Sequence, residues 1–408
     1  MSGATAGFSN IAADPLAEAG VDREFLRSLP AVQQPEWHDA GRLAAVTSEL
    51  EEARPLVDGT EIDTLRALLA RVAAGELRVL QAGDCAEDPA ECTPEAVAPK
   101  AALLDVLASV MSLNAGRKVL RVGRIAGQFG KPRSKPTEHV DGQEMPVFRG
   151  HMVNGPEADL VSRQAQPERL LAGYHAAAAV SGALRDRGAA GYPVADAPIW
   201  TSHEALLLDY ELPLIRRDSD GRSLLTSTHW PWIGDRTRQV DGAHLTMLAM
   251  VANPVACKVG PSTTAEDLLA ICEQLDPDRE PGRLTLISRM GANAVTDLLP
   301  PLVAAVRAAG HPVIWMCDPM HGNTMSTPSG LKTRLVERVV QEVRDFQLVV
   351  PAAGGVAGGL HLETTPTGVT ECADDLSRLG EVGDVYTSFC DPRLNPNQAI
   401  TVAAEWQS

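Results

Sequence analysis

The segment LTLISRMGANAVTDLLPPLVAAVRAAGHPVIWMCD (residues 284–318) decides the fold. It begins with a short apolar run, continues through residues 294–309 with helical periodicity, and ends in a second apolar run at 312–318. Continuous apolar runs are typical of parallel strands that are covered by helices. The order strand, helix, strand therefore predicts a βαβ unit.

The same pattern recurs along most of the chain. Helical periodicity is also found at 263–276 and 330–347, between further apolar runs. Repeated units of this kind favour an α/β fold of the (β/α)8 TIM-barrel type over an open doubly wound sheet. An open sheet would normally carry a GxGxxG fingerprint, and QAGDCAED (81–88) does not fit it. The predicted strands are 77–83, 118–124, 197–204, 228–234, 254–260, 284–290, 312–318 and 359–365.

The domain organisation follows from where this pattern starts. Residues 1–75, with a predicted helix at 60–74, are interpreted as an N-terminal extension, and residues 76–408 as the catalytic barrel. Residues 125–165 are rich in Gly and Pro and too long for an ordinary connection, so we expect a functional loop there.

Composition limits the classes of function. The chain has 408 residues, 44% of them hydrophobic, and a formal net charge of −17, which argues against nucleic-acid binding. No apolar run reaches the roughly 18 residues of a membrane span, and the first residues lack a signal-peptide pattern. Seven cysteines without a CxxC pair argue against a secreted disulfide framework. We therefore expect a cytoplasmic protein that binds neither membrane nor nucleic acid.

Motifs of two common enzyme classes are missing from the sequence. There is no GxSxG nucleophile elbow, and GKPRS (130–134) is too short for the phosphate-binding GxxxxGK[ST] loop. The sequence therefore points away from serine hydrolases and P-loop NTPases.

Basic side chains follow many of the predicted strands. In a TIM barrel the C-terminal strand ends share one face, where active sites lie. Arginine pairs with carboxylate or phosphate in a bidentate manner and lysine supplies a point charge, so this set predicts a ligand with several anionic groups. The alternative is a set of solvated or ion-paired surface charges. The residues are Arg124, Lys131, Arg133, Arg236, Lys258 and Arg289.

A second group of residues at the strand ends could bind a metal. Cys85, His321, Glu363 and Asp391 offer a thiolate, an imidazole and two carboxylates, a mixture that suits a first-row divalent ion. Their wide spacing is not informative by itself. A histidine after a strand, such as His321, can equally be a hydrogen-bonded structural residue.

Sequence blocks carrying these residues occur in a characteristic order. They are QAGDCAE (81–87), GRIAGQFGKPRS (123–134), PTE (136–138), TSHEALLLDYE (201–211), WIGDRTRQVDGAH (232–244), NPVACKVGP (253–261), GRLTLISRMGA (282–292), VIWMCDPMHGNT (313–324), KTR (332–334), GGLHLETT (358–365), VTEC (369–372) and CDPRLN (390–395). Together they resemble the class II 3-deoxy-D-arabino-heptulosonate 7-phosphate (DAHP) synthases, in a short form. These enzymes open the shikimate pathway.

The resemblance implies an activity and a role for each residue. The enzyme would condense phosphoenolpyruvate (PEP) with erythrose 4-phosphate to give DAHP and phosphate, using one divalent ion, Mn2+ or Co2+ before Zn2+ or Fe2+. The metal ligands would be Cys85, His321, Glu363 and Asp391, and the catalytic residues Lys258, Asp235 and Arg124. PEP would contact Arg124, Arg236, Lys258 and Arg289, and erythrose 4-phosphate would contact Lys131, Arg133, Ser134 and, more weakly, Lys332.

Two positions depart from the family pattern. Asp235 stands where the family usually has Glu, whose carboxylate is thought to help place a water beside Lys258; Asp is one methylene shorter. His151 in FRGHMVNG (148–155) replaces an Asp, which exchanges an anion for a group that can be cationic near neutral pH. Either change could tune the sugar substrate or lower activity.

The resemblance leaves several alternatives open. The chain could use PEP with a different aldose or aminosugar phosphate, or be a weakly active paralogue that acts by association, for example with a chorismate mutase. A homodimer or higher homo-oligomer is expected. The short length predicts an enzyme that aromatic amino acids do not inhibit and that feeds specialised metabolism.

Overall fold

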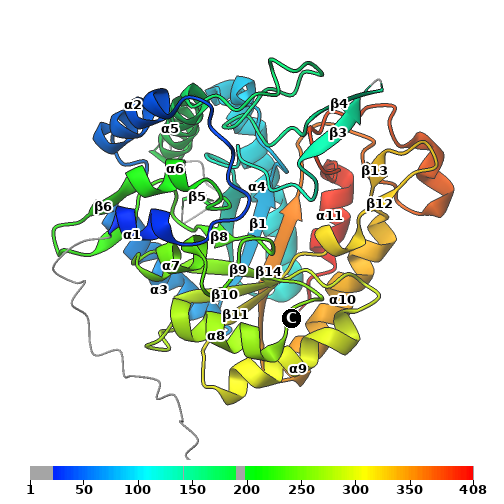
Figure 1. Ribbon diagram of the computed structural model, residues 1–408. Helices are drawn as coiled ribbons and strands as arrows, with labels where there is room; N and C mark the ends of the chain where they lie inside the picture. The colour runs from blue at the N-terminus through cyan, green and yellow to red at the C-terminus, as the bar shows by residue number, and fades with distance from the viewer. Residues whose placement is uncertain (1–21, 141, 190–197, 408) are drawn as a thin grey trace, which may run out of the picture.

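Eight parallel strands form the centre of the protein (Figure 1). The structure, a computed structural model, describes residues 22–140, 142–189 and 198–407. The sheet order is β5-β2-β1-β14-β11-β10-β9-β8. Strands that follow one another in the chain are therefore neighbours in the sheet, and the first strand, β1, lies beside the last, β14. The strands are β1 (Arg78–Gly83), β2 (Val119–Arg124), β5 (Trp200–Thr201), β8 (Trp232–Ile233), β9 (Val255–Val259), β10 (Leu284–Ser288), β11 (Ile314–Cys317) and β14 (Val356–Glu363).

The sheet closes between β5 and β8. Glu204, just after β5, forms a parallel bridge with Trp232 of β8. The N–H of Trp232 donates to the carbonyl of His203 at 3.1 Å, and the N–H of Ala205 donates to the carbonyl of Trp232 at 2.9 Å. These bonds complete a ring, so the predicted (β/α)8 barrel is confirmed.

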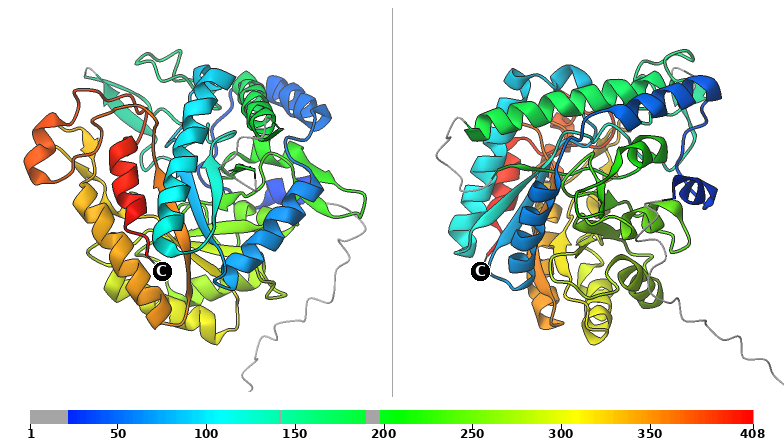
Figure 2. Two further views of the ribbon diagram at one scale, coloured as in Figure 1. Left: turned by 180° about the vertical axis from the view of Figure 1, so that it is seen from behind. Right: turned by 90° about the vertical axis from the view of Figure 1, so that its left-hand side faces the viewer.

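Helices cover the outside of the ring (Figures 1 and 2). They follow the strands in chain order, as βαβ units require. They are α4 (Pro94–Ala115), α5 (Glu168–Ala189), α6 (Leu208–Glu211), α7 (Ala243–Ala249), α8 (Ala265–Leu275), α9 (Val295–Ala308), α10 (Val336–Ala352) and α11 (Pro396–Ala404). Shorter elements in the loops are the 3-10 helices η1 (Pro89–Glu91), η2 (Leu212–Leu214), η3 (His321–Asn323) and η4 (Leu376–Glu381) and the strands β6 (Ile215–Arg217) and β7 (Ser223–Leu225).

All eight predicted strands overlap observed strands, although two are shorter than expected. β5 and β8 have two residues each, and residue 197 of the predicted strand lies outside the described residues. The helix predicted at 330–347 begins only at Val336. Residues 325–333 form a hairpin of β12 (Met325–Ser326) and β13 (Lys332–Thr333), whose turn uses Gly330 at a φ of 89°, a conformation that favours glycine.

Side chains alternate between the barrel interior and the surrounding helices. Part of the barrel interior is apolar, with Val79, Ile287 and Met316 fully buried in one cluster. Helix α3 (Gly59–Ala73) adds three residues to that cluster; its N-terminus is stabilised by a capping box of Asp58 and Glu61. They are Leu65, Leu69 and Val72. This part of the barrel is thus filled by hydrophobic side chains.

The N-terminal residues pack on the barrel. Helix α1 (Arg23–Ser28) contacts α7, and α2 (Ala40–Glu52) contacts α5. The division into an extension of residues 1–75 and a barrel of residues 76–408 stays a prediction, and residues 1–21 lie outside the described part of the chain.

The Gly- and Pro-rich region 125–165 contains a hairpin of β3 (Thr137–Val140) and β4 (Gln143–Pro146). Its first turn is fixed by the buried carboxylate of Glu87, which follows β1. This carboxylate accepts the N–H groups of Ala126, Gly127 and Gln128 at 3.0, 2.9 and 2.7 Å. The loop is therefore anchored to the C-terminal end of the barrel.

Helix α4 is long and apolar enough to span a membrane by length and composition alone. This differs from the expectation that no such segment exists. However, α4 packs against β1, β2, α5 and α11, and the side chains of Leu104, Leu107 and Met111 are buried there. Its apolar character is that of a core helix in a barrel.

Candidate active site

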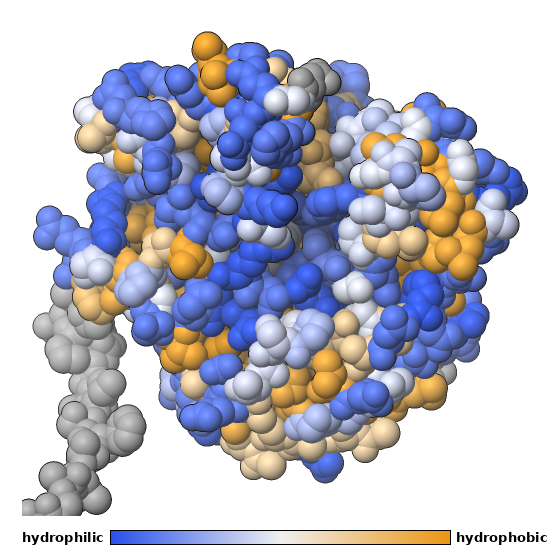
Figure 3. Space-filling model, turned by 45° about the vertical axis from the view of Figure 1, so that its right-hand side comes forward, coloured by the Kyte–Doolittle hydropathy of each residue, from blue (hydrophilic) through white to orange (hydrophobic). Residues whose placement is uncertain are grey.

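A cavity of about 230 Å3 lies at the C-terminal ends of the strands. Hydrophilic residues gather in a hollow of the molecular surface (Figure 3). Two larger cavities, of about 570 and 650 Å3, lie beside α10 and α11 and share no lining residue with the first cavity. The smaller cavity is lined by Lys131, Pro132, Arg133, Ser134, Glu204, Gly234, Asp235, Arg236, Lys258, Arg289, His321, Thr324, Lys332 and Asp391.

This lining unites most of the predicted substrate-binding residues. All four residues predicted for erythrose 4-phosphate line the cavity, and so do Arg236, Lys258 and Arg289 of the PEP group. Arg124 does not line it; its guanidinium is buried and contacts the carboxylate of Glu363 at 3.0 Å. The convergence of so many cations at one small cavity favours a polyanionic ligand over separate surface charges.

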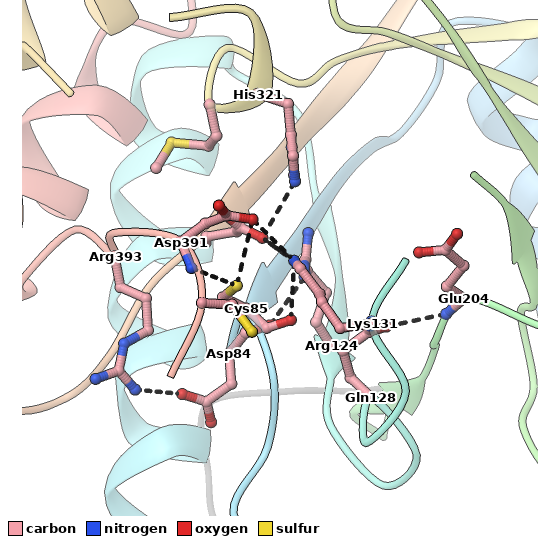
Figure 4. A network of polar contacts seen from close by, with 12 residues as sticks. Asp84, Cys85, Arg124, Gln128, Lys131, Glu204, His321, Asp391 and Arg393 are labelled. Carbon is pink, nitrogen blue, oxygen red and sulfur yellow. Dashed lines mark hydrogen bonds and ion pairs between the residues drawn. The ribbon is translucent and has the colours of Figure 1, made fainter. Parts of the chain in front are cut away.

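Three of the four predicted metal ligands form one cluster, and His321 lies beside it (Figure 4). Ligand atoms of Cys85, Glu363 and Asp391 all lie within 4.8 Å of one another. The N–H of Asp391 donates to Sγ of Cys85 at 3.2 Å, and Nε2 of His321 lies 3.3 Å from Oε1 of Glu363. Cys85 follows β1, Glu363 ends the adjacent β14, and His321 follows β11, so the barrel brings them together.

The donor set fits a divalent cation. Burial disfavours the charged form of Glu363, but His321, Lys131, Arg334 and Arg124 hold its pKa well below the usual range. Asp391 is likewise kept ionised: burial raises its pKa, but the positive charges of Lys131, Arg334 and Lys332 together lower the pKa below its usual range. Both carboxylates are therefore anionic, as ligands of a cation would be. Burial raises the pKa of the Cys85 thiol, and a bound cation would favour its thiolate.

Glu363 is the centre of a buried cluster of positive charges. Its Oε1 lies 3.0 Å from Arg124 Nη2 and 3.4 Å from Lys131 Nζ, and its Oε2 lies 2.8 Å from Arg334 Nη1. The side chains of Glu363 and Arg334 have no exposed surface. Glu363 thus has two roles, as a candidate ligand and as the counter-ion of buried cations.

Asp318 orients the imidazole of His321. It follows β11 directly, and its Oδ2 lies 2.8 Å from Nδ1 of His321 and 2.8 Å from Nζ of Lys258. A proton on Nδ1 donated to Asp318 leaves Nε2 free to face Glu363, which is the usual arrangement of a histidine ligand. Burial lowers the pKa of Lys258, although the charge of Asp318 opposes this shift.

The residues predicted to bind the substrates are joined by direct contacts. Nη2 of Arg236 donates to Oγ of Ser134 at 2.7 Å, which links the residues predicted for the two substrates. Lys131 Nζ lies 3.2 Å from Oδ2 of Asp391, and Lys332 Nζ lies 2.7 Å from its Oδ1. Arg133 donates to Sγ of Cys390 at 3.4 Å. The predicted phosphate site therefore borders the predicted metal ligands.

His151 lies outside the cavity lining. Its ring packs edge-on against Phe148 and Phe389, with centroids 5.2 and 4.9 Å apart, and Nδ1 lies 3.1 Å from the carbonyl of Glu87. Burial lowers its pKa, which disfavours the cationic form that the sequence allowed. The substitution therefore adds a mainly neutral aromatic group to the loop 125–165.

Sequence analysis assigned no role to four residues that the structure places in or around this site. They are Asp318, Arg334, Glu342 and Glu204. A signal existed for Asp318, which stands three residues before His321, and for Arg334 in the KTR block. Glu342 lies in a helix with ordinary amphipathic periodicity, so no local signal marks it.

Glu342 of α10 connects the two loops that carry Arg289 and His321. Its Oε1 accepts the N–H of Gly291 at 2.8 Å, and its Oε2 accepts from Nδ2 of Asn323 at 2.6 Å. The side chain has no exposed surface, and burial raises its pKa to about 8.

The raised pKa of Glu342 predicts a pH dependence of stability. The folded protein retains this proton up to about pH 8, whereas the unfolded chain loses it near pH 4.5. The contribution to the free energy of unfolding is therefore complete below pH 4.5, declines as the pH rises towards 8, and is constant above. Urea denaturation across this range should show a smaller decline for Glu342→Gln than for the wild type. Equal pH slopes for the two proteins would contradict the assignment.

Comparisons with known proteins give the family. A sequence profile described as the class-II DAHP synthetase family matches residues 21–198 and 191–406. A protein of Pseudomonas fluorescens named probable phospho-2-dehydro-3-deoxyheptonate aldolase is 55% identical over 379 residues, which cover 93% of this chain and 95% of that protein. The phospho-2-dehydro-3-deoxyheptonate aldolase of Streptomyces coelicolor is 42% identical, over 92% of this chain and 94% of its own length.

A solved structure agrees on the fold. It is the phospho-2-dehydro-3-deoxyheptonate aldolase of Francisella tularensis, with a TM-score of 0.55 and 12% identity, covering 89% of this chain and 97% of that one. At such low identity it supports the barrel and nothing finer. The resemblance of the sequence blocks is confirmed by the profile and by the relatives: the chain belongs to the class-II DAHP synthetase family.

Proposed function

We propose that this protein condenses PEP with erythrose 4-phosphate to give DAHP and inorganic phosphate. The observation that carries the proposal is the cavity at the strand ends, where six Lys or Arg side chains border the cluster of Cys85, Glu363 and Asp391. Relatives named phospho-2-dehydro-3-deoxyheptonate aldolase, which align over more than nine-tenths of the chain, support it.

The cations would bring two repelling substrates together. The phosphate and carboxylate of PEP would contact Arg124, Arg236, Lys258 and Arg289. The phosphate of erythrose 4-phosphate would contact Lys131, Arg133 and Ser134, with Lys332 as a weaker contact. Fixed charges in a small, partly enclosed cavity need no reorganisation during the reaction. The carbon–carbon bond forms between C3 of PEP and the aldehyde carbon, which leaves C2 electron-poor and open to water.

We infer that Cys85, His321, Glu363 and Asp391 hold one divalent ion. When bound, the ion would act as a Lewis acid that polarises the aldehyde of erythrose 4-phosphate. Thiolate, imidazole and carboxylate together suit a borderline first-row metal. Mn2+ or Co2+ is our first expectation, with Zn2+ or Fe2+ as alternatives.

Removal of metal should abolish this activity. Phosphate release from PEP and erythrose 4-phosphate is expected to fall to background after treatment with a chelator and to return when Mn2+ or Co2+ is added. Full activity in the chelated, metal-free protein would contradict the proposal. A parallel series with other aldose phosphates tests substrate choice, because turnover with only one of them would indicate a different synthase.

The expected partners of the protein also need direct measurement. Light scattering should show a homodimer or a higher homo-oligomer, and titration with a chorismate mutase tests the predicted association. Inhibition by tryptophan or phenylalanine would argue against the unregulated, specialised role that the short sequence predicts. We propose a cytoplasmic location, in keeping with the family of biosynthetic enzymes to which the chain belongs.

A further inference from the structure

Glu204 has one carboxylate oxygen for which the described residues offer no partner. It follows β5 and lines the cavity together with Lys258 and Arg289. Its Oε1 is buried and has no hydrogen-bond partner among the described residues. Its backbone is fixed, because its N–H donates to Oε1 of Gln128 at 2.9 Å (Figure 4). A buried, unpaired carboxylate oxygen costs free energy, so its retention among so many cations points to a use in the reaction.

The neighbouring strand makes room for this carboxylate. A Cβ atom on Gly234 would lie 2.0 Å from Oε1 of Glu204, so only glycine fits at that position. Gly234 directly precedes Asp235 and Arg236, which line the same cavity. The Glu204 carboxylate therefore lies against the segment that carries two of the predicted substrate-site residues.

Asp235 is poorly placed to accept a proton. Its Oδ2 lies 2.6 Å from Nη1 of Arg289, and its Oδ1 lies 3.0 Å from Nε of Arg238. Both oxygens are thus paired with guanidinium groups. The shorter Asp side chain at this position holds Arg289 in place, which leaves the placement of water to another group.

We propose that Glu204 is the general base that takes a proton from the water that adds to C2 of PEP. This inference rests on the proposed function. The water oxygen bonds to C2, one of its O–H bonds breaks, and that proton passes to Glu204. The bond from C2 to the phosphate oxygen then breaks, and its electron pair leaves with the phosphate. The second water proton, now on the C2 hydroxyl, passes to the departing phosphate, and C2 becomes a ketone. Glu204 returns the first proton to the oxygen of the former aldehyde, which becomes a hydroxyl group.

The test separates loss of the base from loss of binding. Glu204→Gln keeps the size of the side chain but cannot accept the proton, so kcat should fall by about 10²–10⁴-fold with little change in KM for PEP. Asp235→Asn should instead raise KM for PEP, because Arg289 loses its counter-ion. The exposed Glu266→Gln on α8 is the matched control and should behave as the wild type.

A second variant makes the test independent of subtle misfolding. In Glu204→Ala, added formate should restore part of kcat, because a small carboxylate can occupy the vacated space; formate should not restore Asp235→Asn. Calorimetric titration with PEP and the thermal unfolding midpoint show whether binding and fold are retained.

The outcomes distinguish this inference from the proposed function. The role of Glu204 would be overturned if Glu204→Gln kept the wild-type kcat, or if a folded Glu204→Ala were not rescued by formate. The proposed function would still stand in that case, provided that the wild type releases phosphate. If the wild type released no phosphate from PEP with any aldose phosphate, both would be wrong.

Discussion

Glu363→Gln is expected to lower the free energy of unfolding by about 3–5 kcal/mol, because it leaves buried positive charges without their counter-ion. Arg334 and Arg124 are at most 1% exposed, and both contact the carboxylate of Glu363. A neutral amide cannot compensate either charge. Urea denaturation in the presence of a chelator measures this effect without any contribution from a metal.

The same variant should lose more than about 100-fold in activity, since groups that only orient metal ligands already cost 10–100-fold when they are removed. The double variant Glu363→Gln with Arg334→Met is the control. Removing one uncompensated charge should restore part of the stability and none of the activity. If Glu363→Gln were as stable as the wild type, Glu363 would not be the counter-ion of the buried arginines.

Gly322→Ala is expected to reduce activity by about 100-fold with only a modest loss of stability. A Cβ on Gly322 would lie 2.3 Å from the backbone nitrogen of Gly291, so the two loops must separate by roughly 1 Å, a displacement that can cost this much. One loop follows Arg289 and the other follows His321. The steady-state KM for PEP should rise, and metal affinity, measured by competition with a fluorescent chelator, should fall.

Gly368→Ala is the matched control for this prediction. Gly368 is exposed, and a Cβ there would meet nothing within 4 Å. Surface substitutions of this kind usually change stability by less than about 0.5 kcal/mol. If both glycine variants kept wild-type activity, the close contact between the two loops would have no part in shaping the site.

The barrel could be predicted from the sequence because buried parallel strands leave a clear signal. The runs at 254–260, 284–290 and 312–318 are apolar on both faces, and helical periodicity separates them. The segment 330–347 misled the prediction, because the β13 residues Lys332 and Thr333 precede a true helix and can be read as its first turn. Local periodicity cannot distinguish a short hairpin from the start of a helix.

The site was less accessible to sequence reasoning than the fold. Cys85 and Asp391 are 306 residues apart in the chain, and only barrel closure puts them in contact. The family resemblance suggested the four metal ligands. The pairing of Asp235 with both Arg289 and Arg238, however, depends on side-chain geometry that the sequence does not show. The free carboxylate of Glu204 likewise follows from what surrounds it, which no spacing rule describes.

The seam between β5 and β8 has a consequence for motion. The other neighbouring strands share between two and six paired positions, whereas among the described residues this seam has the single bridge from Glu204 to Trp232 and a few backbone bonds. Local opening begins where the fewest bonds must break. Hydrogen exchange should therefore be fastest, among the barrel strands, at the amides of Trp232 and Ala205. Each such opening would draw Glu204 away from Gly234, so the rigidity of this one joint sets how steadily the Glu204 carboxylate keeps its place in the cavity.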